Sequence, residues 1–353
     1  MKILVLCSQA TNTGAKLRAE YIFKYLKKAG ADAEYLTPPL KSMPFMLDFA
    51  LSFFYYLFKL MNKKYDFIFV EKPYPNTIIP ILLMKSDKTK IIIDIDDLDY
   101  EYRKGLLSKF IEYIQKQLIK FAWIITSHND ELIRLIKREY PAQMKNIYKL
   151  KQSADLELFS PKNADKQKVR SLKKQFKGKV ILLYMAHLNI ASSLSDIIKA
   201  IKLIKNEPFI LLVIGGGPML SYYKNITKNT NLQDKIIFLG QMNPKEMISY
   251  IYATDVCLVY YENKPVNKYR ASMKLREYLA LRKYVVANNT GDNKLFQNYI
   301  DLTKPTVNAF ADAIKKRIKN IDKSNKKGYK FIRQCFNWEK EGNKFFEFLK
   351  ENL

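Results

Sequence analysis

Three ionisable side chains, Lys274, Arg276 and Glu277, stand at the start of a segment whose apolar residues have helical spacing. A short β-rich run at 256–260 precedes this segment across a polar loop, and a second apolar run follows it at 284–287. Ligands of open α/β sheets bind beyond the carboxyl ends of the strands, and a helix N-terminus at that place favours anions. The pattern therefore predicts a site for a ligand that carries phosphates and hydroxyls.

A second group of chemically active side chains follows the apolar run at 90–94, which predicts another strand. The group consists of the four aspartates Asp94, Asp96, Asp97 and Asp99. Carboxylates at a strand end could hold a metal ion, act as a base or bind substrate hydroxyls. The alternative interpretation is a cluster that caps the following helix. We predict that Asp96 and Asp97 act in catalysis together with Lys274.

The composition indicates a folded protein with a large excess of positive charge. Hydrophobic residues make up 48% and charged residues 27% of the 353 residues, which is typical of a globular chain long enough for two domains. The formal net charge of +27 suggests an anionic partner, which could be a membrane surface, a nucleic acid or a phosphorylated substrate. A background composition rich in lysine is the alternative explanation.

Several classes of site and protein are disfavoured. Three cysteines without a CxxC pair indicate small core residues in a reducing compartment, and the two histidines, His128 and His187, are too few for a His-rich metal site. The first polar loop lacks GxGxxG, which disfavours a dinucleotide-binding dehydrogenase. Met1 leads directly into an apolar strand without a basic region, so we expect no signal peptide and a cytoplasmic protein.

Strands and helices alternate along the chain. Residues 2–7, 15–28 and 33–36 have the pattern of strand, helix and strand, which predicts a parallel, doubly wound sheet. The apolar period is lost in the Lys-rich stretch 162–179 and restarts at 180–185. We therefore expect two doubly wound domains, at 1–165 and 166–335, and a C-terminal helix at 336–353 that packs back on the first domain.

The most hydrophobic stretch is 43–61, which is rich in aromatic residues and carries Asp48 and Lys59. Its length approaches the roughly 20 residues that a membrane-spanning helix needs. The charges near its ends and the flanking lysines favour a helix that lies on a membrane surface over one that spans it. A core helix packed between a sheet and its neighbours is the third interpretation, and the sequence leaves the three open.

Several motifs, taken together and in order, resemble the family-4 type of retaining glycosyltransferases with a GT-B fold. The resemblance covers nearly the whole chain. Its motifs are Thr13-Gly14-Ala15 after the first strand, DLELFSP at 155–161, VIGGGP at 213–218, IIFLGQM at 236–242, SMKLREYLALRKYVVANNTG at 272–291 and CFNWEKEG at 335–342.

The resemblance implies two Rossmann-like domains that face a central cleft. It implies a hexosyltransferase-type enzyme that moves a sugar from a nucleotide-sugar donor to an acceptor hydroxyl, with retained configuration and with no metal or other cofactor. The acceptor would be a glycan or a lipid-linked molecule in polysaccharide, glycolipid or cell-envelope glycan synthesis. From the expected lack of a signal peptide and from the basic, aromatic N-terminal half, we expect a cytoplasmic protein, with a peripheral position on an anionic inner membrane face as one expectation, and no nucleic acid as partner.

The resemblance also implies the donor site. Glu277 would accept hydrogen bonds from the ribose hydroxyls, since a carboxylate binds two adjacent hydroxyls well. Gly14 would lie near the donor phosphates, and the loop at Gly240 would meet the base. The full set of expected donor-binding residues is Gly14, His187, Gly215, Gly216, Gly217, Gly240, Gln241, Glu262, Ser272, Lys274 and Glu277.

The sequence departs from the family pattern at three places. The usual Arg and Lys of the diphosphate clamp correspond to His187 and Ser192, so Lys274, or else Arg276, would supply the charge. The first of two family glutamates corresponds to Tyr269, and Glu262 or Asn263 could replace it. The acceptor-side histidine is replaced by the aspartate cluster.

Two alternatives to a glycosyltransferase follow from the same residues. A sugar-nucleotide epimerase of the same fold would use the same donor site without a second substrate. A non-catalytic protein that binds nucleotides or other anions would account for the net charge. No motif for RNA or DNA binding supports a nucleic-acid partner.

Overall fold

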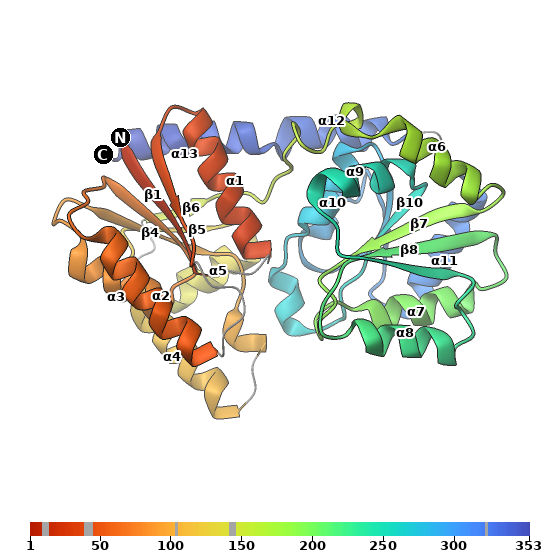
Figure 1. The fold of residues 1–353 in the computed structure, drawn as a ribbon, viewed down its shortest axis with the longest axis horizontal. Coiled ribbons are helices and arrows are strands. Elements are labelled where there is room, and N and C mark those ends of the chain that lie inside the picture. The colour runs from red at the N-terminus through yellow and green to blue at the C-terminus, as the bar shows by residue number, and fades with distance from the viewer. Residues whose placement is uncertain (9–13, 39–44, 103–104, 141–145, 322–323) are drawn as a thin grey trace. The chain divides into compact units, whose positions relative to one another are not determined.

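The computed structural model describes residues 1–8, 14–38, 45–102, 105–140, 146–321 and 324–353. The chain folds into two compact units, each built around its own sheet (Figure 1). The first unit comprises Met1–Gln152 and Trp338–Leu353, and the second comprises Ser153–Asn337. The C-terminal segment thus belongs to the first unit.

The first unit contains a six-stranded parallel sheet in the order β2-β1-β3-β4-β5-β6 among the described residues. Its strands are β1 (Lys2–Cys7), β2 (Asp32–Leu36), β3 (Phe67–Glu71), β4 (Lys90–Ile95), β5 (Ile124–Ser127) and β6 (Ile147–Lys149). The central strands are continuous runs of Ile, Val, Leu and Phe because helices cover both faces of a parallel sheet.

The helices of the first unit lie on opposite faces of its sheet. They are α1 (Gly14–Lys28), α2 (Phe45–Leu60), α3 (Pro75–Met84), α4 (Gly105–Ile119), α5 (Asp130–Glu139) and α13 (Trp338–Glu351), with the short 3-10 helix η1 (Asp99–Tyr102) before α4. The strand order reverses direction after β2, so right-handed crossovers place α1 on one face and α2 to α5 on the other.

Helix α13 packs against α1. The ring centroids of Trp338 and Tyr21 are 5.9 Å apart. A β-carbon at Gly342 would lie 2.6 Å from the β-carbon of Tyr25, so the absence of a side chain at Gly342 allows this close approach. The last helix of the chain therefore completes the first unit.

The second unit repeats the design with a parallel sheet in the order β12-β11-β10-β7-β8-β9. Its strands are β7 (Val180–Met185), β8 (Phe209–Ile214), β9 (Ile236–Gly240), β10 (Val256–Val259), β11 (Tyr284–Asn288) and β12 (Asp301–Thr303). Its α-helices are α6 (Lys166–Gln175), α7 (Leu194–Leu203), α8 (Leu220–Asn229), α9 (Pro244–Ala253), α10 (Met273–Ala280), α11 (Val307–Lys319) and α12 (Lys326–Cys335), and its 3-10 helices are η3 (Pro161–Asn163), η4 (Pro265–Tyr269) and η5 (Gly291–Phe296).

Two apolar layers cover the two faces of the second sheet. Along β7, Ile181 and Leu183 point into one layer, whereas Leu182 and Tyr184 point into the other. Phe159 packs into the first of these layers, so the segment before α6 folds with the second unit. The prediction of two doubly wound, Rossmann-like α/β domains is confirmed.

Within the hydrophobic stretch 43–61, Phe45–Leu60 form α2, and residues 43 and 44 lie outside the described residues. Among the helices of the described segments, none combines the length and the apolar character that crossing a membrane requires.

Candidate functional site

The helix α10 is the next α-helix after β10, separated from it by a loop that contains the 3-10 helix η4, as the sequence predicted a strand, a loop and a helix. Ser272 caps it: the Ser272 hydroxyl accepts a hydrogen bond from the backbone N–H of Leu275 at 3.2 Å. Lys274 and Glu277 lie three residues apart and so share a face of the first helical turns. The cap thus sets the position of both charged side chains.

Glu277 and Lys274 form a pair of ionisable groups with displaced pKa values. Glu277 is 6% exposed, and burial raises the pKa of its carboxyl to about 7, against the opposing effect of the Lys274 charge. Burial also lowers the pKa of Lys274 to about 8, although the nearby Glu277 carboxylate favours its charged form. Both groups therefore change protonation near neutral pH, which is common at functional sites.

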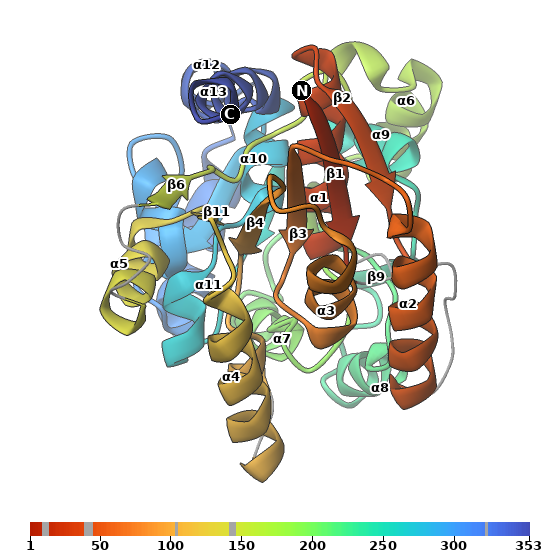
Figure 2. The same cartoon turned by 90° about the vertical axis from the view of Figure 1, so that its left-hand side faces the viewer.

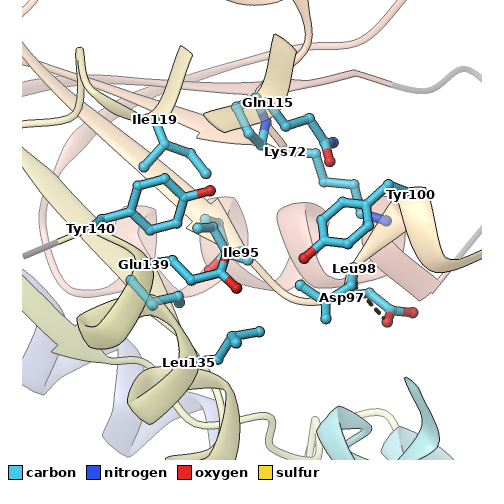
Figure 3. A pocket seen from close by; sticks show the side chains of 13 residues that line it. Lys72, Ile95, Asp97, Leu98, Tyr100, Gln115, Ile119, Leu135, Glu139 and Tyr140 are labelled. Atoms are coloured by element: carbon cyan, nitrogen blue, oxygen red, sulfur yellow. Dashed lines mark hydrogen bonds between the residues drawn. The ribbon is translucent and has the colours of Figure 1, made fainter. Parts of the chain in front are cut away.

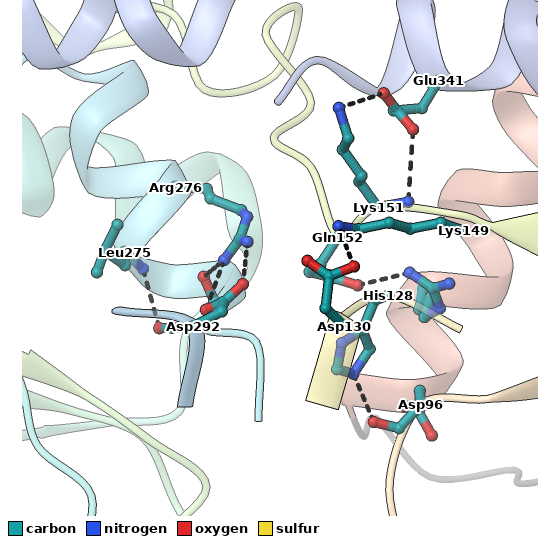
Figure 4. A network of polar contacts seen from close by, with 12 residues as sticks. Asp96, His128, Asp130, Lys149, Lys151, Gln152, Leu275, Arg276, Asp292 and Glu341 are labelled. Atoms are coloured by element: carbon teal, nitrogen blue, oxygen red, sulfur yellow. Dashed lines mark hydrogen bonds and ion pairs between the residues drawn. The ribbon is translucent and has the colours of Figure 1, made fainter. Parts of the chain in front are cut away.

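Arg276 lies on a different side of α10 and is 1% exposed. Its guanidinium forms an ion pair with Asp292 and donates to the backbone oxygen of Ser272 at 2.8 Å (Figure 4). Its carbon Cζ lies 5.0 Å from the ring centre of Phe296 and 4.7 Å from that of Phe336. Arg276 is therefore part of the packing of the second unit, and Lys274 remains the candidate cation of this helix.

A further cation near this pair, Arg270, was missed by the sequence analysis. Arg270 is half-buried in the loop before α10, with Cζ 5.1 Å from the ring centre of Tyr261. Its positive charge is one of the causes that lower the pKa of Lys274. The sequence offered only a weak signal, namely an arginine close to the predicted helix start.

The glycines after β8 let two loops approach each other. Gly215 has φ +140° and Gly217 has φ +150°, which other residues rarely adopt. A β-carbon at Gly215 would lie 1.8 Å from the carbonyl oxygen of Ala186. The backbone N–H of Leu188 donates to the carbonyl of Gly216 at 2.9 Å. The loop after β8 therefore lies directly against the loop after β7.

Replacing Gly215 with alanine should destabilise the second unit by about 3 kcal/mol or more, because the methyl group meets a backbone oxygen in a strained conformation. Gly178 is the matched control: it has φ +80° but open space around it, so Gly178→Ala measures strain without the clash. Urea unfolding of both variants gives the comparison. Equal losses in the two variants would show that the loops after β7 and β8 are free to separate.

The remaining predicted donor residues of the second unit follow neighbouring strands. His187 is exposed after β7, Gln241 is exposed after β9, and Glu262 follows β10. The backbone N–H of Gly215 donates to the carbonyl of Gly240 at 2.8 Å, which joins the ends of β8 and β9. These residues, Gly216 and the start of α10 thus share the carboxyl edge of one sheet.

Glu262 is already engaged within its loop. Its carboxylate pairs with Lys264, and its backbone N–H donates to the hydroxyl of Ser193 at 3.2 Å. Tyr269, which stands where the family has a glutamate, is 9% exposed. Asn263 is exposed in the same loop.

In the first unit, Asp94 has a structural role. It is fully buried at the end of β4, and the guanidinium of Arg18 donates to its two oxygens at 2.7 and 3.0 Å. Thr126 on β5 donates to the same carboxylate at 2.6 Å. Arg18 also donates to the backbone oxygen of Leu150, so this network ties α1 to the sheet.

Asp96 and Asp97 follow β4 at the carboxyl edge of the first sheet. The Nε2 atom of His128 lies 2.5 Å from the backbone oxygen of Asp96 (Figure 4), and the ammonium of Lys72 lies 3.5 Å from its carboxylate. Asp97 accepts a hydrogen bond from the N–H of Leu98 at 2.9 Å. The side chain of Asp99 lies outside the described residues.

Lys72 and His128 were not among the predicted site residues. Each directly follows a strand, Lys72 after β3 and His128 after β5, so adjacent parallel strands bring both beside Asp96. Lys72 is 7% exposed and has φ +64°, an uncommon backbone conformation that is often found at functional sites. Strand order, which the sequence does not show, decides this grouping.

Three further observations concern the candidate site residues. The cavity beneath α4 and α5, with Tyr100 and Tyr140 on opposite sides (Figure 3), has a volume of about 20 Å³, enough for a water molecule but not for a sugar. Across the described segments, no group of three or more His, Cys, Asp or Glu side chains is arranged to hold a metal ion. Gly14, the first residue of α1, is exposed, and the residues before it lie outside the described segments.

Comparison with known proteins shows what the two units resemble. Residues 165–333 match the model for glycosyl transferases group 1, whereas no curated protein has a significantly similar sequence. Three similar structures are HepE of Anabaena with UDP and glucose (TM-score 0.77, 15% identity, 99% of each chain), sucrose-phosphate synthase of Thermosynechococcus elongatus (0.77, 16%, 99% of each) and a glycosyltransferase of Rickettsia africae (0.72, 16%, 99% of this chain and 98% of the other). At such identities the structures show the fold alone. The chain therefore has a GT-B fold, and its residues 165–333 match the model for glycosyl transferases group 1.

Proposed function

We propose that the protein is a retaining glycosyltransferase of the hexosyltransferase type, which transfers a sugar from a nucleotide-sugar donor to an acceptor hydroxyl. The observation that carries the proposal is the Lys274–Glu277 pair at the start of α10, inside the matched domain. A buried carboxylate beside an ammonium, at the carboxyl edge of a parallel sheet, suits a ligand that combines hydroxyls with a diphosphate.

In this proposal, different residues of the second unit bind different parts of the nucleotide-sugar donor. Glu277 accepts hydrogen bonds from the ribose hydroxyls, and Lys274 together with Arg270 stabilises the charge on the leaving diphosphate. Each well-placed donor of this kind is worth about 3 kcal/mol in the transition state. Gly215 to Gly217 let the donor approach the backbone, and Gly240 with Gln241 meets the base. No step in this scheme needs a metal ion.

The acceptor belongs to the first unit in this proposal. Asp96, with Lys72 and His128 beside it, and the neighbouring Asp97 orient the acceptor hydroxyl and take up its proton. The acceptor is a glycan or a lipid-linked molecule of polysaccharide, glycolipid or envelope synthesis. The protein works in the cytoplasm at the inner face of the membrane.

Calorimetry with a panel of UDP- and GDP-sugars tests the proposal. The UDP-sugars come first because HepE, which shares the fold, was crystallised with UDP-glucose. We expect micromolar to millimolar binding of at least one donor; intact protein that binds none would refute the proposal. Product analysis without an acceptor separates the epimerase alternative, which converts the donor itself. Binding without any conversion, with or without acceptors, would favour a non-catalytic protein.

Donor affinity should depend on pH with a maximum between about 7 and 8. Glu277 accepts hydroxyl hydrogen bonds as a carboxylate, so with a pKa of about 7 the affinity should fall roughly tenfold per unit at lower pH. Lys274, with a pKa of about 8, loses its charge above that value, which weakens diphosphate binding. Calorimetric dissociation constants across this range provide the measurement. A Glu277→Gln variant should lack the acid limb, and an acid limb that survives in it would contradict the assignment.

A further inference from the structure

Helix α2 exposes several of its large apolar side chains, while two of its three buried side chains among the described residues, Ser52 and Tyr56, carry hydroxyl groups. Its exposed large residues are Leu47, Leu51, Phe54 and Phe58, of which Phe54 is 64% and Phe58 69% exposed. The side that faces the first unit presents Ser52, Tyr56 and Leu60. The hydroxyl of Tyr56 donates to the backbone oxygen of Cys7 at 2.5 Å, which holds the helix in this orientation. Burial of hydrophobic side chains within the unit would favour the opposite orientation.

Helix α4 has the same inverted arrangement. Its exposed residues include Leu106, Leu107, Phe110 and Tyr113, and Leu106 is 86% exposed. Its buried residues are Gln115, Leu118 and Ile119, of which the two apolar ones stand at its C-terminal end. The first half of α4 thus exposes leucine, phenylalanine and tyrosine side chains that no described part of the unit covers, which leaves this apolar face for a partner.

Helix α3 connects the two. It lies between α2 and α4 on the same face of the first sheet (Figure 2). Its exposed large apolar side chains are Ile79 and Leu83. We call the exposed apolar side chains of α2, α3 and α4 the apolar helix face. It extends across three neighbouring helices, whereas scattered single hydrophobic residues are normal on protein surfaces.

The exposed charged side chains in the part of the chain that forms this face are mostly positive. From residue 45 to residue 121, the exposed charged residues of the described segments are Lys59, Lys63, Lys64, Lys88, Lys109 and Lys120 against Asp87 and Glu101. Lys59, Lys63 and Lys64 follow Phe58 at the end of α2, where Lys63 pairs with Glu34 at 2.7 Å, and Lys109 stands between Leu107 and Phe110 on α4. Apolar side chains with lysines beside them are the pattern of helices that lie in a membrane interface.

We propose that the apolar helix face docks the protein on an anionic lipid bilayer, with α2 and α4 both lying in the interface. Its aromatic and leucine side chains enter the acyl boundary, and its lysines contact anionic headgroups. A second copy of the chain fits less well, because pairing two such faces would bring lysines of like charge together. The proposal deepens the proposed function, on which it rests for its purpose: a bilayer would present a lipid-linked acceptor to the first unit.

Vesicle co-sedimentation of the full chain tests the proposal, with neutral vesicles compared with vesicles containing about 30% anionic phosphatidylglycerol. The variants are Phe54→Ser with Phe58→Ser on α2, and Leu106→Ser with Phe110→Ser on α4. The matched control is Leu203→Ser with Tyr222→Ser, which removes two exposed apolar side chains from the second unit.

We expect the natural chain to bind anionic vesicles more tightly than neutral ones, and each helix variant to lose roughly tenfold or more in partition coefficient. The control should bind as the natural chain does. If only the α2 variant lost vesicle binding, the proposal that the whole apolar helix face docks on the bilayer would be overturned. Equal loss in the control, or no binding by the natural chain, would overturn membrane docking.

Two further measurements keep the outcomes distinct. In sedimentation velocity without lipid, the natural chain should not self-associate through the apolar helix face. Self-association that the helix variants abolish would assign this face to a second copy of the chain. Donor affinity of both helix variants should equal that of the natural chain, because the substituted residues are not among the predicted donor-binding residues. Failure of lipid binding with intact donor binding would thus refute docking alone, and absence of donor binding would refute the proposed function alone.

Discussion

Replacing Glu277 with alanine should weaken donor binding about 100-fold, because two charge-assisted hydrogen bonds to the ribose, together about 3 kcal/mol, are lost. Isothermal titration of the natural chain and the variant with the best donor of the panel measures the difference. Glu246, an exposed glutamate on α9, is the matched control, and Glu246→Ala should bind the donor normally. An unchanged affinity in Glu277→Ala would remove this residue from the site.

Above neutral pH, the buried carboxylate of Glu277 should lower the stability of the unliganded protein. This effect on stability distinguishes a binding role of Glu277 from a structural role. Its pKa in the folded state, about 7, lies above the ordinary value of 4.5, so the folded state holds the proton more tightly than the unfolded chain does. The stability that this carboxyl contributes is therefore lost as pH rises from about 4.5 to 7. At pH 8 we expect Glu277→Gln to be more stable than the natural chain by about 1–3 kcal/mol. A Glu277→Gln variant that unfolds more easily would indicate a structural role.

Replacing Arg276 with alanine should destabilise the second unit by about 3–5 kcal/mol, since Asp292, 6% exposed, would remain buried without its partner. Chemical unfolding followed by fluorescence measures the loss. Arg333→Ala is the control, because Arg333 is exposed on α12, and its removal should change stability by less than about 0.5 kcal/mol.

A double variant tests the cause of this loss. Arg276→Met with Asp292→Leu removes both charges and keeps apolar volume, so it should recover much of the stability that Arg276→Ala loses. Lys274→Ala should behave in the opposite way, with nearly normal stability and weakened donor binding. A stable Arg276→Ala variant with lost donor binding would exchange the roles that we assign to the two cations.

The sequence by itself determined the alternation of strands and helices, the repeat of the doubly wound pattern and the position of the site helix. These features depend on local spacing: buried parallel strands are short continuous apolar runs, and α10 begins at a capping serine after β10. The glycines after β8 were also predictable, because their positive φ values and close contacts need residues without a side chain.

Only the tertiary structure decided which of the neighbouring charges are structural and which are candidates for function. Arg276 is engaged by the carboxylate of Asp292 and the ring of Phe336. Both residues are distant from it in the sequence, so local spacing could not predict these contacts. Strand order brings Lys72 and His128 beside Asp96 for the same reason. The orientation of α2 likewise depends on the contact between Tyr56 and Cys7, which are far apart in the sequence. A hydrophobic pattern alone could therefore not show that Phe54 and Phe58 face outward.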